Sequence, residues 1–102
     1  MTTPHTGDPE IDRALAEMAA HTARFEEVSR LLDETRGRGE SAGGQVAVEL
    51  KATGSLAALH IDPRAMRLGS QALAEAIVAA FRLAEEDVAA QSYDVARTVF
   101  DT

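Results

Sequence analysis

The sequence predicts an α+β fold with a long N-terminal helix, a β-hairpin and a long C-terminal helix, in which the sheet is completed by homodimerisation. Three observations carry this prediction. Apolar residues recur with a helical period near both ends of the chain and alternate like a strand in the middle. Gly37, Gly39, Gly43 and Gly44 separate the first helical pattern from the strands. A hairpin with only two strands is marginal in water, so a second copy is expected to extend it.

The first helix is expected over about residues 9–35. Asp8 can cap the free N–H groups of the first turn, and Pro9 suits the first helical position. Apolar residues then follow at steps of four and three, the spacing of a helix face that packs on another surface. The stripe consists of Ile11, Leu15, Met18, Thr22, Phe25, Ser29 and Leu32, in which Thr22 and Ser29 are two polar interruptions. The pattern leaves open whether this stripe packs only within its own subunit or also on a partner chain.

The hairpin is expected from Val46–Ala52 and Leu56–Ile61, which alternate apolar and other residues around the turn signal Thr53–Ser55. Asp62-Pro63 ends the second strand, because proline cannot continue a ladder of backbone hydrogen bonds. The segment from Arg36 to Gly44 is predicted to be a flexible connector. The glycines leave open whether residues 35–39 add a third antiparallel strand.

The second long helix is expected over about residues 70–98, with Ser70 as its cap and fraying after Gln91. Its apolar stripe is Leu73, Ile77, Ala80, Phe81, Ala84 and Val88, followed more weakly by Val95 and Val99. At 102 residues the chain fits a single domain. We therefore expect a disordered tail at residues 1–8, one domain over 9–98 and a frayed end at 99–102.

The expected core is small, because the chain has many alanines, three Phe, one Tyr and no Trp. Association with a second copy would supply the missing apolar burial, and a twofold axis would make the contact self-complementary. The hairpin and the first helix provide the residues expected at this dimer interface. They are Val46, Val48, Leu50, Leu59, Ile61, Phe25 and Leu32.

The residue types argue against an enzyme and against a metal or cofactor site. There is no cysteine for a disulfide, a thiolate ligand or a nucleophile. His21 follows Glu17 by four residues, and His60 precedes Asp62 by two, but such pairs are usually solvated surface residues. The acidic run Glu85–Asp87 cannot converge on one ion, because successive helical side chains point about 100° apart. Residues 1–10 have no secretory pattern, and no apolar run is long enough to cross a bilayer.

Three connected segments of the sequence resemble the YbaB/EbfC family of bacterial nucleoid-associated proteins. The first is Gly44–Val48 with its turn at Gly54, and the second is Leu59–Pro63, which reads Leu-His-Ile-Asp-Pro. The third is Leu73–Phe81 with Ala84 further on. The resemblance implies a cytoplasmic, nucleoid-bound homodimer that joins its sheets and binds DNA with little sequence preference. It also implies that the chain has neither catalytic residues nor a cofactor.

The net charge of −7, from 10 basic and 17 acidic residues, is the wrong sign for a protein that binds phosphates globally. Local arginines would therefore have to hold DNA, since guanidinium can grip a phosphate with two hydrogen bonds. The candidates are Arg30, Arg36, Arg38, Arg64 and Arg67. The alternative is that these arginines form ion pairs within the chain, with Asp33, Glu34, Glu40 and Asp62. The alternative function is an acidic homodimer that docks a basic protein partner and binds no DNA.

Overall fold

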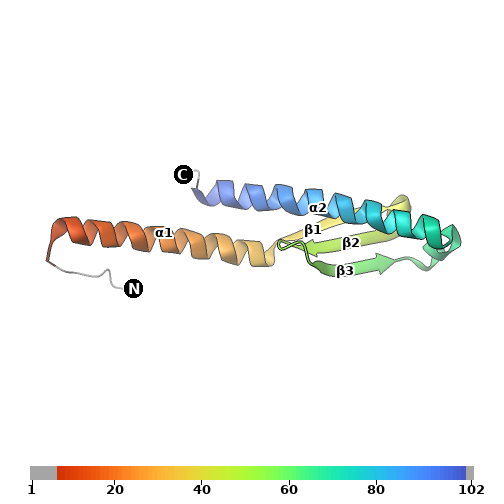
Figure 1. Cartoon of the computed structure of the whole chain (residues 1–102), viewed down its shortest axis with the longest axis horizontal. Coiled ribbons are helices and arrows are strands. Elements are labelled where there is room, and N and C mark those ends of the chain that lie inside the picture. The colour runs from red at the N-terminus through yellow and green to blue at the C-terminus, as the bar shows by residue number, and fades with distance from the viewer. Residues whose placement is uncertain (1–6, 101–102) are drawn as a thin grey trace.

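A computed structural model of the chain describes residues 7–100 and shows an α+β subunit (Figure 1). Two long helices flank a three-stranded antiparallel sheet, so the third strand that the sequence left open is present. Short 3-10 turns follow the first strand and the last strand. In chain order the elements are α1 (Pro9–Glu34), β1 (Arg36–Ser41), η1 (Ala42–Gly44), β2 (Val46–Lys51), β3 (Leu56–Ile61), η2 (Pro63–Leu68) and α2 (Ser70–Phe100).

The start of α1 is as the sequence predicts. Asp8 is its N-cap, and the Asp8 carboxylate accepts a hydrogen bond from the backbone N–H of Glu10 at 2.9 Å. The end of α2 differs, because the helix continues without a break to Phe100 and does not fray after Gln91. A ring contact between Phe100 and Phe25 of α1 supports this last part. Of the tail expected at residues 1–8, residues 1–6 lie outside the described part of the chain, as do the last two residues, and Asp8 is ordered as the N-cap.

The sheet has the order β1-β2-β3, and its register decides which side chains share a face. Gly39 of β1 lies opposite Val48 of β2, which in turn lies opposite Leu59 of β3. A register shift at Glu49/Leu50 places Leu56 opposite Leu50. Because side chains alternate between faces along a strand, the large apolar side chains of β2 and β3 lie on one face of the sheet.

Helix α2 packs on that apolar face, mainly over β1 and β2. The buried core consists of Val46, Val48, Leu50, Ala65, Ala80 and Ala84, with Leu73, Ala76, Ile77 and Phe81 packed beside it. The two glycines of β1 lie directly against the helix backbone, since a Cβ atom on Gly37 would come within 2.5 Å of the Ala84 carbonyl oxygen. Small residues on both elements thus allow this close approach.

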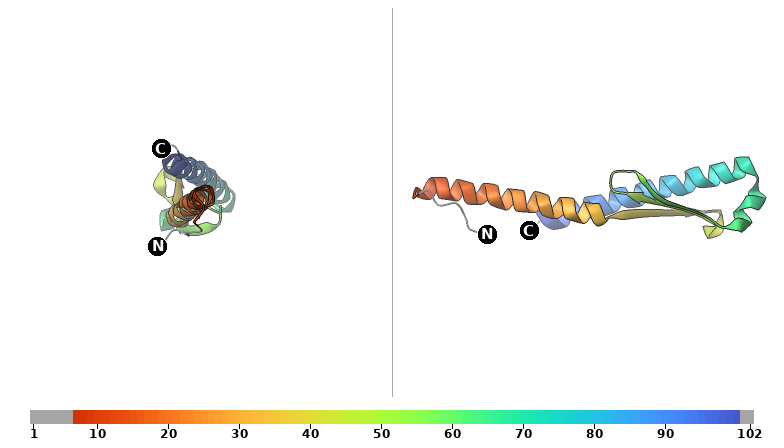
Figure 2. Two further views of the ribbon diagram at one scale, coloured as in Figure 1. Left: turned by 90° about the vertical axis from the view of Figure 1, so that its left-hand side faces the viewer. Right: turned by 90° about the horizontal axis from the view of Figure 1, so that it is seen from below.

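The subunit is far more extended than an ordinary domain of its length. Its radius of gyration is 21.2 Å and its extents are 73 × 21 × 15 Å, whereas a compact domain of roughly 100 residues has a radius of gyration of about 13 Å. Helix α1 leads away from the sheet beside the last turns of α2 (Figure 2). None of its 26 residues is buried. The core alone therefore does not account for the shape of this chain.

Candidate nucleic-acid interface

The face of the sheet opposite α2 carries the charged side chains of the strands, and in residues 7–100 no helix packs on it, although Ala47 within it is buried. We call it the open face and define it from the register. Arg36 is paired with Lys51, and Arg38 is paired with Glu49. The open face consists of Arg36, Arg38 and Glu40 from β1, Ala47, Glu49 and Lys51 from β2, and Ala58 and His60 from β3. Its three cations outnumber its two carboxylates, although the whole chain is acidic.

Arg38 lies in the middle of the open face between two carboxylates. Its guanidinium donates hydrogen bonds to Glu40 and Glu49, each at 2.9 Å. The hydrogen bond to Glu40 is the main reason that the pKa of Arg38 is raised further above its ordinary value. Both ion pairs are exposed, so they are weak and open to exchange with another anion.

Arg36 and Lys51 form a cation pair at the end of the sheet next to α1. Arg36 donates hydrogen bonds to the backbone carbonyl oxygens of Asp33 at 3.1 Å and Thr35 at 2.9 Å, so it also closes the end of α1. Within residues 7–100, neither cation has an ion pair with a carboxylate. Both line a pocket whose other walls are Ser29, Leu32, Asp33, Ala52 and Thr53. A phosphate could therefore bind either cation without displacing a carboxylate of the described residues.

Arg30 lies on the last turns of α1 and is held by its own helix. It forms ion pairs with Glu27 at 2.9 Å and with Glu34 at 3.5 Å. The hydrogen bond to Glu27 is the largest cause that raises the pKa of Arg30. These are helical neighbours three and four residues apart, an arrangement that stabilises a helix surface only slightly.

Arg64 and Arg67 lie in η2, which follows the far end of β3. The Arg64 guanidinium binds the Asp62 carboxylate at 3.0 Å, and this hydrogen bond lowers the pKa of Asp62. Arg67 is exposed and has no ion pair among the described residues. Since β3 is six residues long, the two basic clusters are separated by about 17–20 Å, the length of a strand. The fold of one subunit does not bring them together.

The expected ion pairs within the chain are therefore confirmed for three of the five candidate arginines. Arg30 pairs with Glu34, Arg38 pairs with Glu40, and Arg64 pairs with Asp62. Arg36 and Arg67 have no such pair. Arg36 lies beside Asp33, but it donates a hydrogen bond to the backbone carbonyl oxygen of that residue and has no ion pair with its side chain. The sequence reasoning did not single out Lys51. Its position on the open face follows only once β1 is known to pair with β2.

The residues predicted for the dimer interface fall into two groups. Val46, Val48 and Leu50 are fully buried beneath α2, so they belong to the core of the subunit and present no surface to a second chain. Leu59 and Ile61 remain 41% and 37% exposed, and Leu56, which the prediction omitted, is 54% exposed. Phe25 is exposed on α1, and Leu32 is half-buried nearer the sheet.

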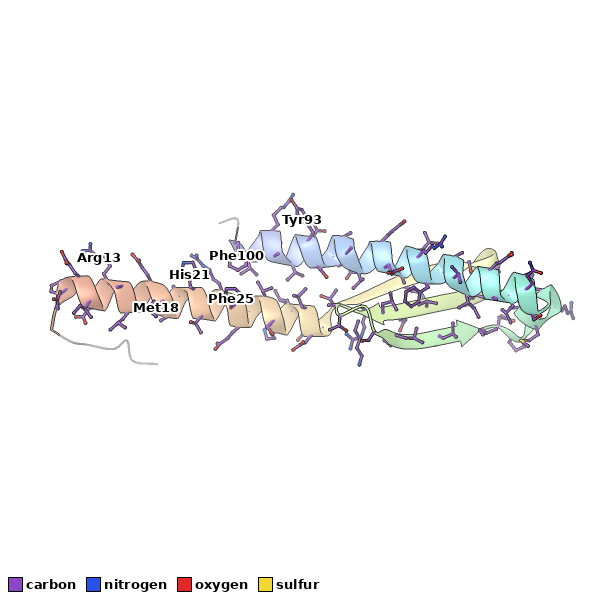
Figure 3. The ribbon with its side chains drawn as sticks, in the orientation of Figure 1. Arg13, Met18, His21, Phe25, Tyr93 and Phe100 are labelled. Atoms are coloured by element: carbon purple, nitrogen blue, oxygen red, sulfur yellow. The ribbon has the colours of Figure 1, made fainter. Side chains whose placement is uncertain are left out.

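The residues that were weighed for a metal site lie apart from one another. No group of three or more His, Asp or Glu side chains in residues 7–100 could hold a metal ion. His21 lies on the surface of α1, and His60 is exposed on the open face (Figure 3 labels His21). In the same part of the chain, none of the helices is both long enough and apolar enough to span a membrane.

Comparison with known proteins gives one family and one fold. The model of the YbaB/EbfC DNA-binding family matches residues 8–101, nearly the whole chain. A crystal structure titled as an uncharacterized protein, HP0035 from Helicobacter pylori, is similar with a TM-score of 0.60 at 20% sequence identity. The similarity covers 78% of this chain and 93% of that one, and at this identity it shows the fold alone. No curated protein matches the sequence.

Proposed function

The chain belongs to the YbaB/EbfC DNA-binding family, and on that premise we propose that it is a homodimeric nucleoid-associated protein that binds double-stranded DNA with little sequence preference. Its role would be nucleoid organisation or gene regulation, in the cytoplasm. The family is described by DNA binding and not by a catalytic activity. The observation that carries the finer proposal is the open face, where cations outnumber carboxylates in an acidic chain.

The dimer is supported by the uncovered strand at the edge of the sheet. Among residues 7–100, β3 pairs with β2 alone, and Leu56, Leu59 and Ile61 lie on its apolar face, while α2 packs mainly over β1 and β2. These three side chains carry no charge, so a second acidic copy is not repelled there. Pairing two such edges would satisfy free backbone groups and bury apolar surface in one step. A sheet of six strands would replace two sheets of three.

The DNA contacts are proposed to be phosphate contacts made by Arg36 and Lys51, with Arg38 and Arg30 beside them. Arg36 and Lys51 need not break an ion pair with a carboxylate in residues 7–100 to bind a phosphate. Arg38 would exchange its ion pair with Glu40 or Glu49 for one with a phosphate of the DNA backbone. Contacts of this kind position a protein on DNA and carry no sequence information, which agrees with weak specificity. Arg64 and Arg67 would add a second, separate contact.

The proposal is tested by titrating DNA binding against salt with the full chain and a double variant, Arg36→Ala with Lys51→Ala. Each neutralised phosphate contributes about 0.9 to the slope of log K against log salt concentration. The double variant is expected to bind every DNA sequence more weakly and with a shallower slope. Circular dichroism and light scattering verify that it remains folded and in the same oligomeric state.

The matched control removes two positive charges elsewhere, with Arg13→Ala on α1 and Arg82→Ala on α2. If net charge alone governed binding, both double variants would weaken it equally, and the open face would not be the DNA site. If the wild-type chain formed no complex at low salt and tens of micromolar protein, DNA binding itself would be rejected for this chain. A monomeric mass in the same samples would reject the dimer.

A further inference from the structure

The two edges of the sheet differ in what their backbone groups meet. β1 and β3 are the edge strands, and β2 lies between them. In an antiparallel ladder, alternate residues turn their N–H and C=O groups away from the neighbouring strand. At an edge, these outward groups can pair with a strand of another chain. Within residues 7–100, side chains hydrogen-bond to such groups on β1 and to none on β3.

Asp87 and Gln91 of α2 occupy the outward groups of β1. The Asp87 carboxylate accepts a hydrogen bond from the backbone N–H of Arg38 at 2.8 Å. The Gln91 side-chain amide donates to the backbone carbonyl oxygen of Arg36 at 2.8 Å and to the Asp87 carboxylate at 3.0 Å. Asp87 and Gln91 are four residues apart and therefore share a face of the helix. The pair offers β1 one acceptor and one donor, as a neighbouring strand would.

The close packing of α2 on β1 makes these hydrogen bonds possible. Gly37 has no side chain to hold the helix away, and a Cβ atom added there would lie 2.5 Å from the Val88 Cβ. Figure 1 shows α2 running beside β1, with β3 on the far side of the sheet. From this position, a side chain as short as Asp87 reaches the edge of the strand. An incoming strand would have to displace both side chains of α2 from β1.

We propose that Asp87 and Gln91 seal the β1 edge against strand addition by a second copy of this chain, so that the sheet can grow only at β3. The pairing at β3 rests on the proposed dimer, whereas the seal is a property of one subunit. With one edge sealed, two copies use up both open edges and the assembly stops at two. Without the seal, each copy would offer two different edges, and β1-to-β3 contacts could repeat into an open-ended sheet.

The seal is tested in the full chain by combining Asp87→Ala with Gln91→Ala, since alanine favours helix and should preserve α2. Light scattering over a wide range of protein concentrations should give one mass for the wild-type chain and a rising mass for the variant. Hydrogen exchange of the Arg38 amide should accelerate on the order of tenfold or more. Gln91→Ala alone should show the same effects more weakly, which keeps the test decisive if the double variant does not fold.

Two results would overturn the seal. An unchanged mass in a variant whose Arg38 amide exchanges freely would show that an open β1 edge does not recruit another copy. Unchanged protection of the Arg38 amide would show that the side chains of α2 do not hold this edge.

The matched control is Glu86→Ala with Gln71→Ala, which removes one carboxylate and one amide from exposed positions of α2. It should keep the wild-type mass. Asp87→Asn removes the charge but keeps an oxygen that can accept from Arg38, so it should keep the wild-type mass as well. Growth of the Asp87→Asn variant equal to that of the double alanine variant would mean that charge repulsion limits assembly, and the seal would be rejected.

Adding Leu59→Asp to the double alanine variant separates the seal from the proposed dimer. If both proposals hold, the triple variant can pair only through β1 and should stop at two copies. A monomeric wild-type chain would reject the dimer at β3, whereas a gain of mass in the double alanine variant would still support the seal.

Discussion

Gly39 of β1 lies directly against the backbone of Ala80 in α2. A Cβ atom added to Gly39 would overlap the Ala80 carbonyl oxygen and would come within 2.5 Å of the Ala84 backbone nitrogen. Beside this contact, the Ser41 hydroxyl donates a hydrogen bond to the Ala76 carbonyl oxygen at 2.5 Å. The absence of a side chain at Gly39 is therefore what lets α2 lie so close to β1.

We expect Gly39→Ala to destabilise the subunit strongly. Adding carbon to a packed core usually costs about 1–3 kcal/mol, and here the obstacle is helix backbone, which cannot rotate away. The free energy of unfolding, measured by urea denaturation, should fall by an amount at or above the upper end of this range. Gly54→Ala is the control, because nothing lies within 4 Å of its added Cβ and only its positive φ is strained. A smaller effect at Gly39 than at Gly54 would contradict this packing.

The glycines show where sequence reasoning reached its limit on the fold. The helical and strand periodicities located α1, β2, β3 and α2 because each of these elements has an apolar face. β1 has no apolar face, since its inward positions are Gly37 and Gly39 and its outward ones are charged. A strand of this kind is specified by close approach to α2, which is a tertiary contact. Local pattern therefore suggested a flexible connector where the structure has an ordered edge strand.

Neutralising a carboxylate on the open face should tighten DNA binding. Glu49→Gln removes one ion pair of Arg38 and one negative charge from the face on which we place the phosphates. The affinity at low salt is expected to rise several-fold, and the gain should shrink as salt screens the charges. Glu86→Gln on α2 makes the same change of charge on an exposed helix position. An equal gain in both variants would count against the open face as the DNA site.

The pKa of Asp62 should depend on Arg64. The guanidinium and the backbone N–H of Arg64 both donate to this carboxylate, and they hold its pKa below the ordinary value. A carboxylate with a lowered pKa stabilises the fold above the unfolded pKa of about 3.9, and this contribution disappears as the pH falls through the folded pKa. In Arg64→Gln the pKa of Asp62, followed by carboxyl NMR, should move up toward the ordinary value.

If β3 forms the dimer contact, thermal stability should depend on protein concentration. A dimer that buries Leu56, Leu59 and Ile61 is stabilised by mass action, so Tm should rise as the chain is concentrated. Leu59→Asp should give a monomer with a lower Tm that no longer depends on concentration. Val78→Asp places the same charge on a comparably exposed side chain and should keep the dependence. A concentration-independent Tm of the wild-type chain, with a monomeric mass, would rule out this interface.

The candidate site was only partly predictable for a related reason. Sequence could identify which residues are basic, but it could not tell which of them already have a partner. Arg38 is neutralised from β2 by Glu49, eleven residues away, and Lys51 is placed beside Arg36 by strand pairing. Both facts depend on the register of β1 against β2. In the same way, the alternation in β2 correctly predicts that Val46, Val48 and Leu50 share a buried face. The prediction that a partner chain covers this face was wrong, because α2 covers it.

The ring contact between Phe25 and Phe100 should couple the ends of the two helices. Edge-to-face aromatic pairs contribute about 0.5–1.5 kcal/mol beyond their buried area. In a double-mutant cycle with Phe25→Leu and Phe100→Leu, each single change should lower the free energy of unfolding, and the second should cost less once the first is made. Hydrogen exchange of the last turns of α2 should accelerate in Phe25→Leu, because Phe100 then loses its aromatic partner. Strictly additive effects, with unchanged exchange near Phe100, would show that the two helices end independently of one another.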